Sequence, residues 1–103
     1  MTDLHEVERE LGRIVDRLNS MPLTKVASAS DDVHDTAEFL VAQTRLLGDS
    51  PPAEATLPRL APQGLGAMLA VVGGDYLEAA RASSEPDVDP VLNALVELRR
   101  ALP

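Results

Sequence analysis

The chain has 103 residues, which is enough for one domain that buries a modest core of its own. It contains no Cys or Trp, one Phe, one Tyr and two His, so disulfides and thiolate metal sites are excluded and aromatic stacking surfaces are not expected. Acidic residues outnumber basic ones by 17 to 9, giving a formal net charge of −8. Because no basic stripe is present, we expect neither nucleic acid nor an anionic membrane surface as a partner.

The sequence also predicts a cytoplasmic location. Its first ten residues lack the positive start and the apolar stretch that a signal peptide needs. The longest uncharged, apolar-rich run covers residues 64–74 and is too short to cross a bilayer.

The first predicted helix covers residues 3–20. Asp3 and Glu6 have the spacing of a capping box at its start, and Pro22 ends the pattern because proline cannot continue a helix. Its apolar residues alternate at spacings of three and four, which is a heptad pattern: Leu4, Val7, Leu11, Ile14, Leu18 and Met21.

We expect a turn over residues 21–29 and a second helix over about 30–47, ended by Gly48. The same spacing of three and four continues through Val33, Leu40 and Leu47. The intervening members, Ser30, Ala37 and Thr44, are small, which favours close approach by a neighbouring helix.

Residues 49–62 contain four prolines and predict a rigid connector that is long enough to cross from one end of a helical bundle to the other. A helix then begins at Pro62, which is a favoured first-turn residue. Gly73 and Gly74 together cost about 2 kcal/mol in a helix interior relative to Ala. We therefore predict a break or a kink at this pair, with helices over 62–72 and 75–82.

The last predicted helix covers residues 89–102. Asp89 is the expected N-cap and Pro90 the first helical residue, while Arg99 and Arg100 complement the dipole in the last turn. Its apolar residues again follow the heptad spacing: Val88, Val91, Leu95, Leu98 and Leu102. With no segment of period two, these elements predict an all-α fold, a single domain over residues 1–103 built as a small four- to five-helix bundle.

No motif for catalysis or for cofactor binding is found. Gly64-Leu65-Gly66 lacks the third glycine of a dinucleotide fingerprint, because position 69 is Leu, and no strand precedes it. The sequence also has no Gly-Lys pair, no Gly-x-Ser-x-Gly and no His-Glu-x-x-His. This pattern favours a non-enzymatic protein without a cofactor.

One acid-rich turn contains residue types that can bind a metal ion. Asp31, His34, Asp35 and Glu38 lie within two helical turns and have ligand types that bind divalent ions. A bundle site also needs Glu-x-x-His from a facing helix, whereas residues 5–8 supply only the reversed order, His-x-x-Glu. The interpretation we favour is a solvated first turn, and no metal site is predicted.

The second helix carries an additional apolar stripe, and this is our leading candidate for function. Phe39, Ala42 and Leu46 recur at i, i+3 and i+7 on a face other than the heptad seam. A helix that is apolar on two sides is either central in its bundle or presents one side to another chain. We interpret the stripe as a surface for homodimerisation or for a protein partner, the structural alternative being that the proline-rich connector covers Phe39.

A second hypothesis is a site for a small ligand, or a minor enzymatic site, between helices near Gly73, Gly74 and Tyr76. Glycines permit close approach of a ligand to the backbone, and Tyr76 is the aromatic residue with a polar end. The structural alternative for the glycines is a junction between two helices.

Overall fold

A computed structural model describes residues 3–47, 61–84 and 86–103. Within these ranges the fold is all-α, as predicted, with five α-helices and one 3-10 turn. None of these helices is both long and apolar enough to span a bilayer. The elements are α1 (Leu4–Ser20), α2 (Leu23–Ser28), α3 (Ser30–Leu46), η1 (Pro62–Gly64), α4 (Leu65–Ala82) and α5 (Asp89–Ala101).

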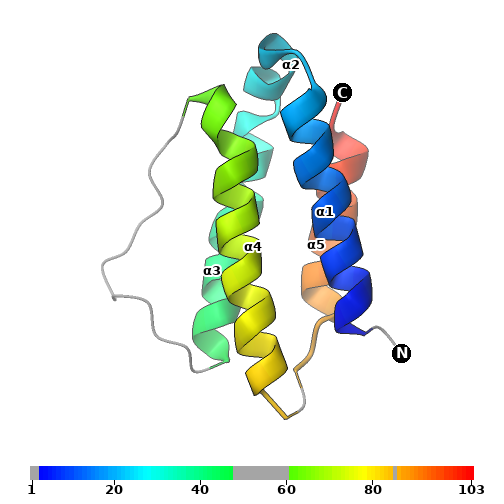
Figure 1. Cartoon of the computed structure of the whole chain (residues 1–103), viewed down its shortest axis with the longest axis vertical. Coiled ribbons are helices and arrows are strands. Elements are labelled where there is room, and N and C mark those ends of the chain that lie inside the picture. The colour runs from blue at the N-terminus through cyan, green and yellow to red at the C-terminus, as the bar shows by residue number, and fades with distance from the viewer. Residues whose placement is uncertain (1–2, 48–60, 85) are drawn as a thin grey trace.

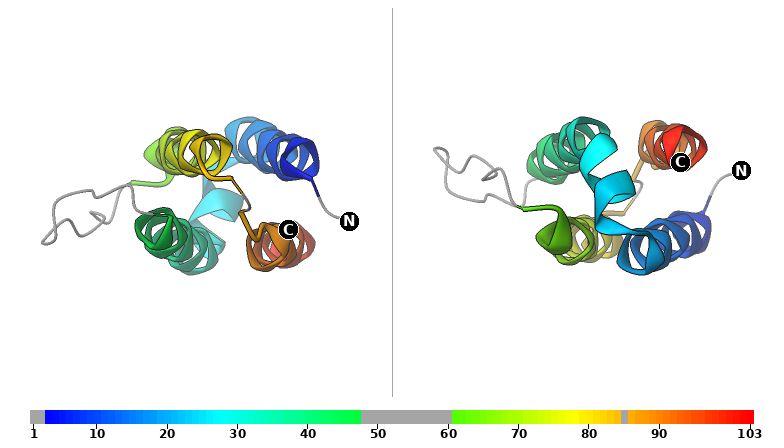
Figure 2. Two further views of the ribbon diagram at one scale, coloured as in Figure 1. Left: turned by 90° about the horizontal axis from the view of Figure 1, so that it is seen from below. Right: turned by 90° about the horizontal axis from the view of Figure 1, so that it is seen from above.

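The four long helices form a bundle in which α1 and α3 lie diagonally opposite each other, as do α4 and α5 (Figures 1 and 2). Helices α1 and α5 run in one direction and α3 and α4 in the other, so α4 is parallel to α3 and antiparallel to α1 (Figure 1). Because α3 ends and α4 begins at opposite ends of the bundle, this order fits the prediction that the connector crosses from end to end. Residues 48–60 themselves lie outside the described residues.

Helix α1 forms where its cap and apolar spacing predict it. The Asp3 carboxylate accepts a hydrogen bond from the Glu6 backbone N–H at 3.0 Å, which satisfies one of the unpaired donors of the first turn. Its heptad residues face the core, where they pack with buried residues from each of the other α-helices. The buried apolar core includes Val7, Leu11, Ile14, Leu18, Val26, Val33, Ala37, Leu40, Leu65, Leu69, Val72, Tyr76, Leu77, Val91, Leu95 and Leu98.

The turn predicted over residues 21–29 is wrong for its central part, which forms the short helix α2. The Pro22 carbonyl accepts the N–H groups of Lys25 and Val26, so the proline that ends α1 also starts the next turn. Val26 and Ala29 are buried. Helix α2 therefore lies across the upper end of the bundle, between α1 and α3 (Figure 2).

The break predicted at Gly73–Gly74 is also wrong, because α4 is one continuous helix from Leu65 to Ala82. A Cβ atom at Gly73 would overlap both Leu11 methyl groups of α1 and lie 3.1 Å from Leu11 Cγ. One heptad earlier, a Cβ at Gly66 would overlap Asn19 Oδ1 and lie 3.6 Å from Leu18 Cβ. These two glycines let α1 and α4 approach closely, and the packing gained offsets their unfavourable helix propensity.

Helix α5 begins at Asp89, as predicted, and ends at Ala101, one residue before the predicted end. Val88, rather than the predicted Asp89, occupies the cap position and provides no side-chain hydrogen bond, while the Asp89 N–H donates to the Asp87 carboxylate at 3.3 Å. Pro90 occupies the first turn, as predicted, where its missing N–H costs no helical hydrogen bond.

The two adjacent glycines of α4 are expected to respond oppositely to alanine. Gly73→Ala forces an overlap with Leu11, so we expect the free energy of unfolding to fall by about 1 kcal/mol after the gain in helix propensity. Nothing lies within 4 Å of a Cβ at Gly74, so Gly74→Ala should raise it by roughly 0.5–1 kcal/mol. Urea denaturation followed by far-ultraviolet circular dichroism measures both. Equal effects of the two substitutions would contradict close packing at Gly73.

Candidate functional site

The predicted stripe on α3 lies on the outside of the bundle. Ala42 is exposed, and the Leu46 side chain is 78% exposed, the highest value among the exposed large apolar residues of the described ranges, which also include Leu23 and Val71. Phe39 is half-buried and packs against the core. We call Phe39, Ala42 and Leu46 the outer α3 stripe.

The opposite face of α3 is buried in the core of the bundle. Val33, Ala37 and Leu40 are buried, and Thr44 is buried with its hydroxyl donating to the Leu40 carbonyl at 2.8 Å. Helix α3 therefore needs no further apolar residues to hold its place in the bundle. The structural alternative for Phe39, cover by the proline-rich connector, falls on residues outside the described ranges.

The structure places the residues of the alternative ligand site in the helix packing. Tyr76 is 1% exposed and belongs to the core, and Leu11 lies against Gly73. Gly74 is half-buried, with no atom near a Cβ position. Burial raises the pKa of the Tyr76 phenol, and the negative charge of Asp87 raises it further. These contacts favour a packing role for Gly73 and Tyr76.

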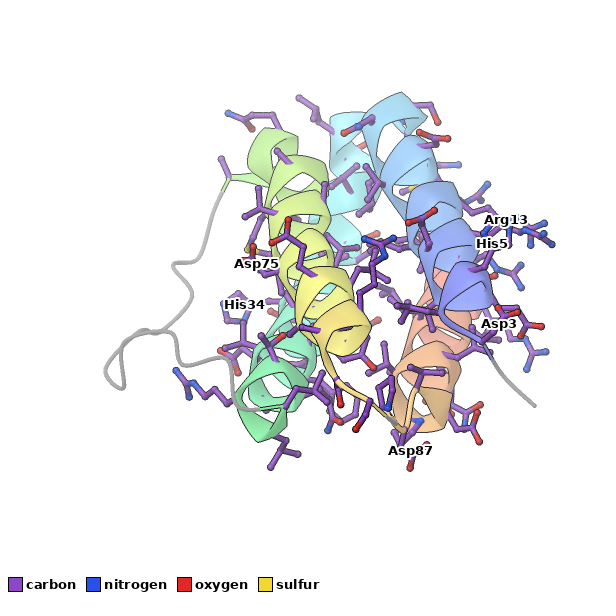
Figure 3. The ribbon with its side chains drawn as sticks, turned by 60° about the horizontal axis from the view of Figure 1, so that its bottom comes forward. Asp3, His5, Arg13, His34, Asp75 and Asp87 are labelled. Atoms are coloured by element: carbon purple, nitrogen blue, oxygen red, sulfur yellow. The ribbon has the colours of Figure 1, made fainter. Side chains whose placement is uncertain are left out.

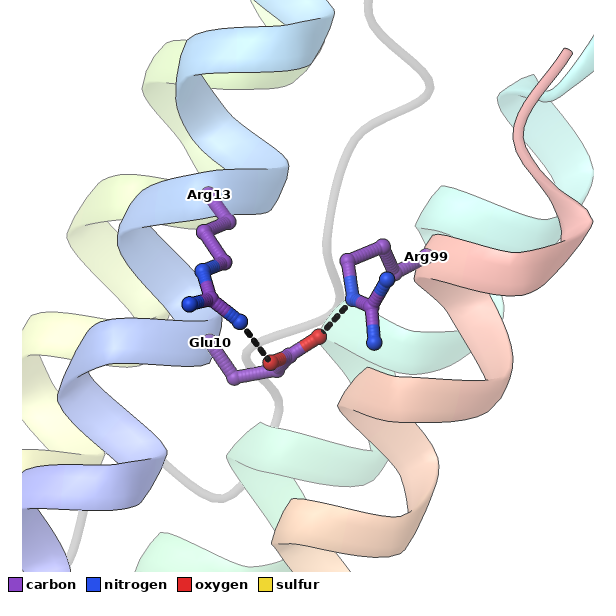
Figure 4. Close-up of polar contacts among 3 residues, drawn as sticks. All are labelled: Glu10, Arg13 and Arg99. Atoms are coloured by element: carbon purple, nitrogen blue, oxygen red, sulfur yellow. Dashed lines mark hydrogen bonds and ion pairs between the residues drawn. The ribbon is translucent and has the colours of Figure 1, made fainter.

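A part-buried ion pair between α1 and α5 was not predicted from the sequence; its Glu10 side chain is buried, whereas its Arg99 side chain is 39% exposed. The Glu10 carboxylate, 8% exposed, accepts a hydrogen bond from Arg99 Nε, and Arg13 Nη1 lies 3.6 Å from its other oxygen (Figure 4). Glu10 precedes Leu11 and Arg99 follows Leu98, so both residues flank their heptad seams at the positions that pair between parallel helices. That register is the signal in the sequence that reveals the pair once α1 and α5 are known to be parallel neighbours.

Two further polar contacts tie α1 to its neighbours. Arg81 of α4 pairs with Glu8, and Arg17 donates to the Pro103 carbonyl. The Arg81–Glu8 pair is about half exposed, and such surface pairs contribute little to stability. These contacts are accounted for by the packing of the bundle.

The two histidines do not meet. His34 is buried on α3, with Nδ1 at 3.3 Å from the Glu38 carboxylate, whereas His5 is exposed on α1. Figure 3 shows them on opposite sides of the bundle. Across the described ranges, no group of three or more His, Cys, Asp or Glu residues is arranged to hold a metal ion.

Comparison with known proteins assigns no family to the chain. No protein-family model matches it, and neither a curated protein nor a solved structure matches it significantly.

Removing the cation that pairs with the buried Glu10 carboxylate should destabilise the bundle. Arg99→Met leaves the Glu10 carboxylate buried with Arg13 alone, so we expect the free energy of unfolding to fall by about 1–3 kcal/mol. The double variant Glu10→Leu/Arg99→Met should recover most of this loss, because no charge is then buried. Arg100→Met, at the exposed neighbouring position, is the control and should change stability by less than about 0.5 kcal/mol. A loss as large in the control would contradict the pair.

Tyr76 should also make stability depend on pH under alkaline conditions. The pKa of Tyr76 in the folded protein is raised above the ordinary value of 10.0. The neutral ring therefore contributes fully to the free energy of unfolding below pH 10.0, and this contribution is lost as the pH rises through the folded pKa. The absorbance of tyrosinate reports this residue alone, because the chain has one Tyr and no Trp. We expect ionisation above pH 10.0 in the folded protein and a smaller alkaline loss of stability in Tyr76→Phe. An unshifted titration would contradict the burial of this ring.

Proposed function

We propose that this chain is a non-enzymatic helical protein that acts by binding another protein chain, a second copy or a different partner, through the outer α3 stripe. The observation that carries the proposal is the 78% exposure of Leu46 at the end of an apolar stripe. Burying a leucine side chain contributes about 1.5–3 kcal/mol, so a residue left in water on a regular face offers binding energy to a partner.

The geometry of the stripe supports this proposal further. Ala42 is small and exposed between Phe39 and Leu46, so a partner helix can approach the backbone of α3 at this point. Phe39 is anchored by its contact with the core, which holds its ring in place before any partner arrives. A side chain that is partly ordered before association loses less conformational freedom on binding, which favours affinity.

The buried polar groups support a non-enzymatic role. Glu10 is engaged by Arg99 and Arg13, and His34 by Glu38. A catalytic acid or base acts on a substrate that it can reach, whereas these groups contact other side chains of the bundle. We also propose a cytoplasmic location, and we infer that nucleic acid is not a partner because the acidic sequence has no basic stripe.

The alternative, a small-ligand site near Gly73, Gly74 and Tyr76, has less support. Leu11 lies against Gly73, so the approach that this glycine permits is used by α1. Tyr76 is enclosed in the core and has almost no surface to offer a ligand. The outer α3 stripe therefore has the stronger support as the functional surface.

Leu46→Glu tests the proposal, because this exposed position tolerates a charge without a change in the core. Val71→Glu, at an exposed apolar position on α4, is the matched control. Sedimentation equilibrium over a concentration series and affinity purification from the source cells, with quantitative mass spectrometry, compare both variants with the wild type. We expect a self-associated species or a retained partner in the wild type and in Val71→Glu, and its loss in Leu46→Glu.

The proposal fails if all three proteins are monomeric and retain the same proteins. Circular dichroism and thermal melting establish that each variant is folded. Leu46→Glu is preferred to Phe39→Asp for this test because Phe39 also packs against the core, so its substitution changes stability together with binding.

A further inference from the structure

The outer α3 stripe is part of a longer series with a charge pattern of its own. Asp32, Asp35, Phe39, Ala42 and Leu46 follow one another at spacings of three, four, three and four, which makes a second heptad series on α3. Asp32 and Asp35 are exposed, like Ala42 and Leu46. We call these five residues the outer seam. It is acidic in its first two turns and apolar in its last two.

Helix geometry sets the dimensions of this surface. Phe39 and Leu46 are seven residues apart, or about 10 Å along the axis, and Asp35 lies about 6 Å before Phe39. The complete outer seam from Asp32 to Leu46 spans about 21 Å. A partner helix of about 15 residues therefore covers both halves.

We propose that the outer seam binds a basic amphipathic helix of a different protein. This inference rests on the proposed function and specifies its partner. Matched position by position, an antiparallel partner has apolar residues at i, i+4 and i+7, opposite Leu46, Ala42 and Phe39. It has Lys or Arg at i+11 and i+14, opposite Asp35 and Asp32. The antiparallel direction is favoured because its cations then lie near the partner helix's own C-terminus, where they complement its dipole.

Charge argues for a basic partner and against a second copy. Each chain carries a formal net charge of −8, so two copies repel each other during approach whereas a basic segment is attracted. Two antiparallel α3 helices centred on Ala42 would pair Phe39, Ala42 and Leu46 only, leaving Asp32 and Asp35 beyond the contact. A basic helix uses all five positions of the outer seam.

The charges around the seam support this choice. Helix α3 contains four acidic residues and one arginine, Arg45; the acidic residues are Asp31, Asp32, Asp35 and Glu38. Neither Asp32 nor Asp35 forms an ion pair with a cation in the part of the chain that the structure describes. The two carboxylates are thus available to a cation from another protein.

Two designed helical peptides test the inference. Both carry Leu at i, i+4 and i+7; one has Lys at i+11 and i+14, and the other has Glu at these positions. Fluorescence anisotropy with labelled peptides measures binding to the full chain. We expect the Lys peptide to bind about tenfold more tightly than the Glu peptide, with an affinity that falls as salt is added.

Variants of the chain assign this preference to the outer seam. Asp32→Asn/Asp35→Asn should weaken binding of the Lys peptide by about three- to tenfold and should remove its advantage over the Glu peptide. The control Asp16→Asn/Asp75→Asn, which makes the same change in net charge at exposed positions outside the seam, should retain most of the advantage. Leu46→Glu should abolish binding of both peptides. Thermal melting establishes that each variant is folded.

The outcomes separate this inference from the proposed function. Equal binding of the two peptides, both still dependent on Leu46, overturns the basic partner while the apolar docking surface stands. A Leu46-dependent homodimer that the Lys peptide does not dissociate also overturns the inference and leaves the proposed function intact. Absence of peptide binding, together with identical sedimentation and purification results for Leu46→Glu and wild type, overturns both.

Discussion

The close approach of α1 to α4 is the constraint on which the rest of the bundle depends. Gly73 has room for the Leu11 methyl groups only because it has no side chain, and at Gly66, one heptad earlier, the Asn19 side chain of α1 comes equally near. The apolar residues of α1 therefore pack closely against α4, which is one continuous helix through its glycine pair. Tyr76 of this helix lies in the core, and the negative charge of Asp87, in the segment before α5, adds to the effect of burial in raising its pKa.

The sequence predicts those elements whose local signals agree with their tertiary surroundings. The predicted extents of α1, α3 and α5 match the structure to within one residue at each end, because heptad spacing and end signals point the same way in each. It fails at Gly73–Gly74, where helix propensity opposes continuation and packing against Leu11 favours it. The pairing of Glu10 with Arg99 could not be predicted either, because it depends on α1 and α5 being parallel neighbours, and no local sequence pattern specifies which helices are neighbours.

The candidate site was likewise predicted only in part from the sequence. The spacing of Phe39, Ala42 and Leu46 is visible in the sequence, but the different exposure of its members is not. Phe39 reaches the core while Leu46 lies in water, and this difference arises from the position of each residue relative to neighbouring helices. Tyr76 shows the opposite case. Its position beside two glycines suggests a ligand site in the sequence. In the structure, the Tyr76 ring is buried in the core and Gly73 packs against Leu11.

The two heptad series of α3 differ in burial. The inner series meets the core through Val33, Ala37 and Leu40, and the bundle is complete with it. The outer seam adds nothing to that core beyond part of the Phe39 ring, yet it keeps a regular order of carboxylates followed by apolar side chains. Leaving Leu46 in water brings no gain to the folded chain, and adjacent carboxylates in one helix repel each other. The fold does not require this arrangement, in which charge and apolar surface occupy separate halves of the outer seam, and it is the basis on which we propose a partner that is basic opposite the carboxylates and apolar opposite the apolar residues.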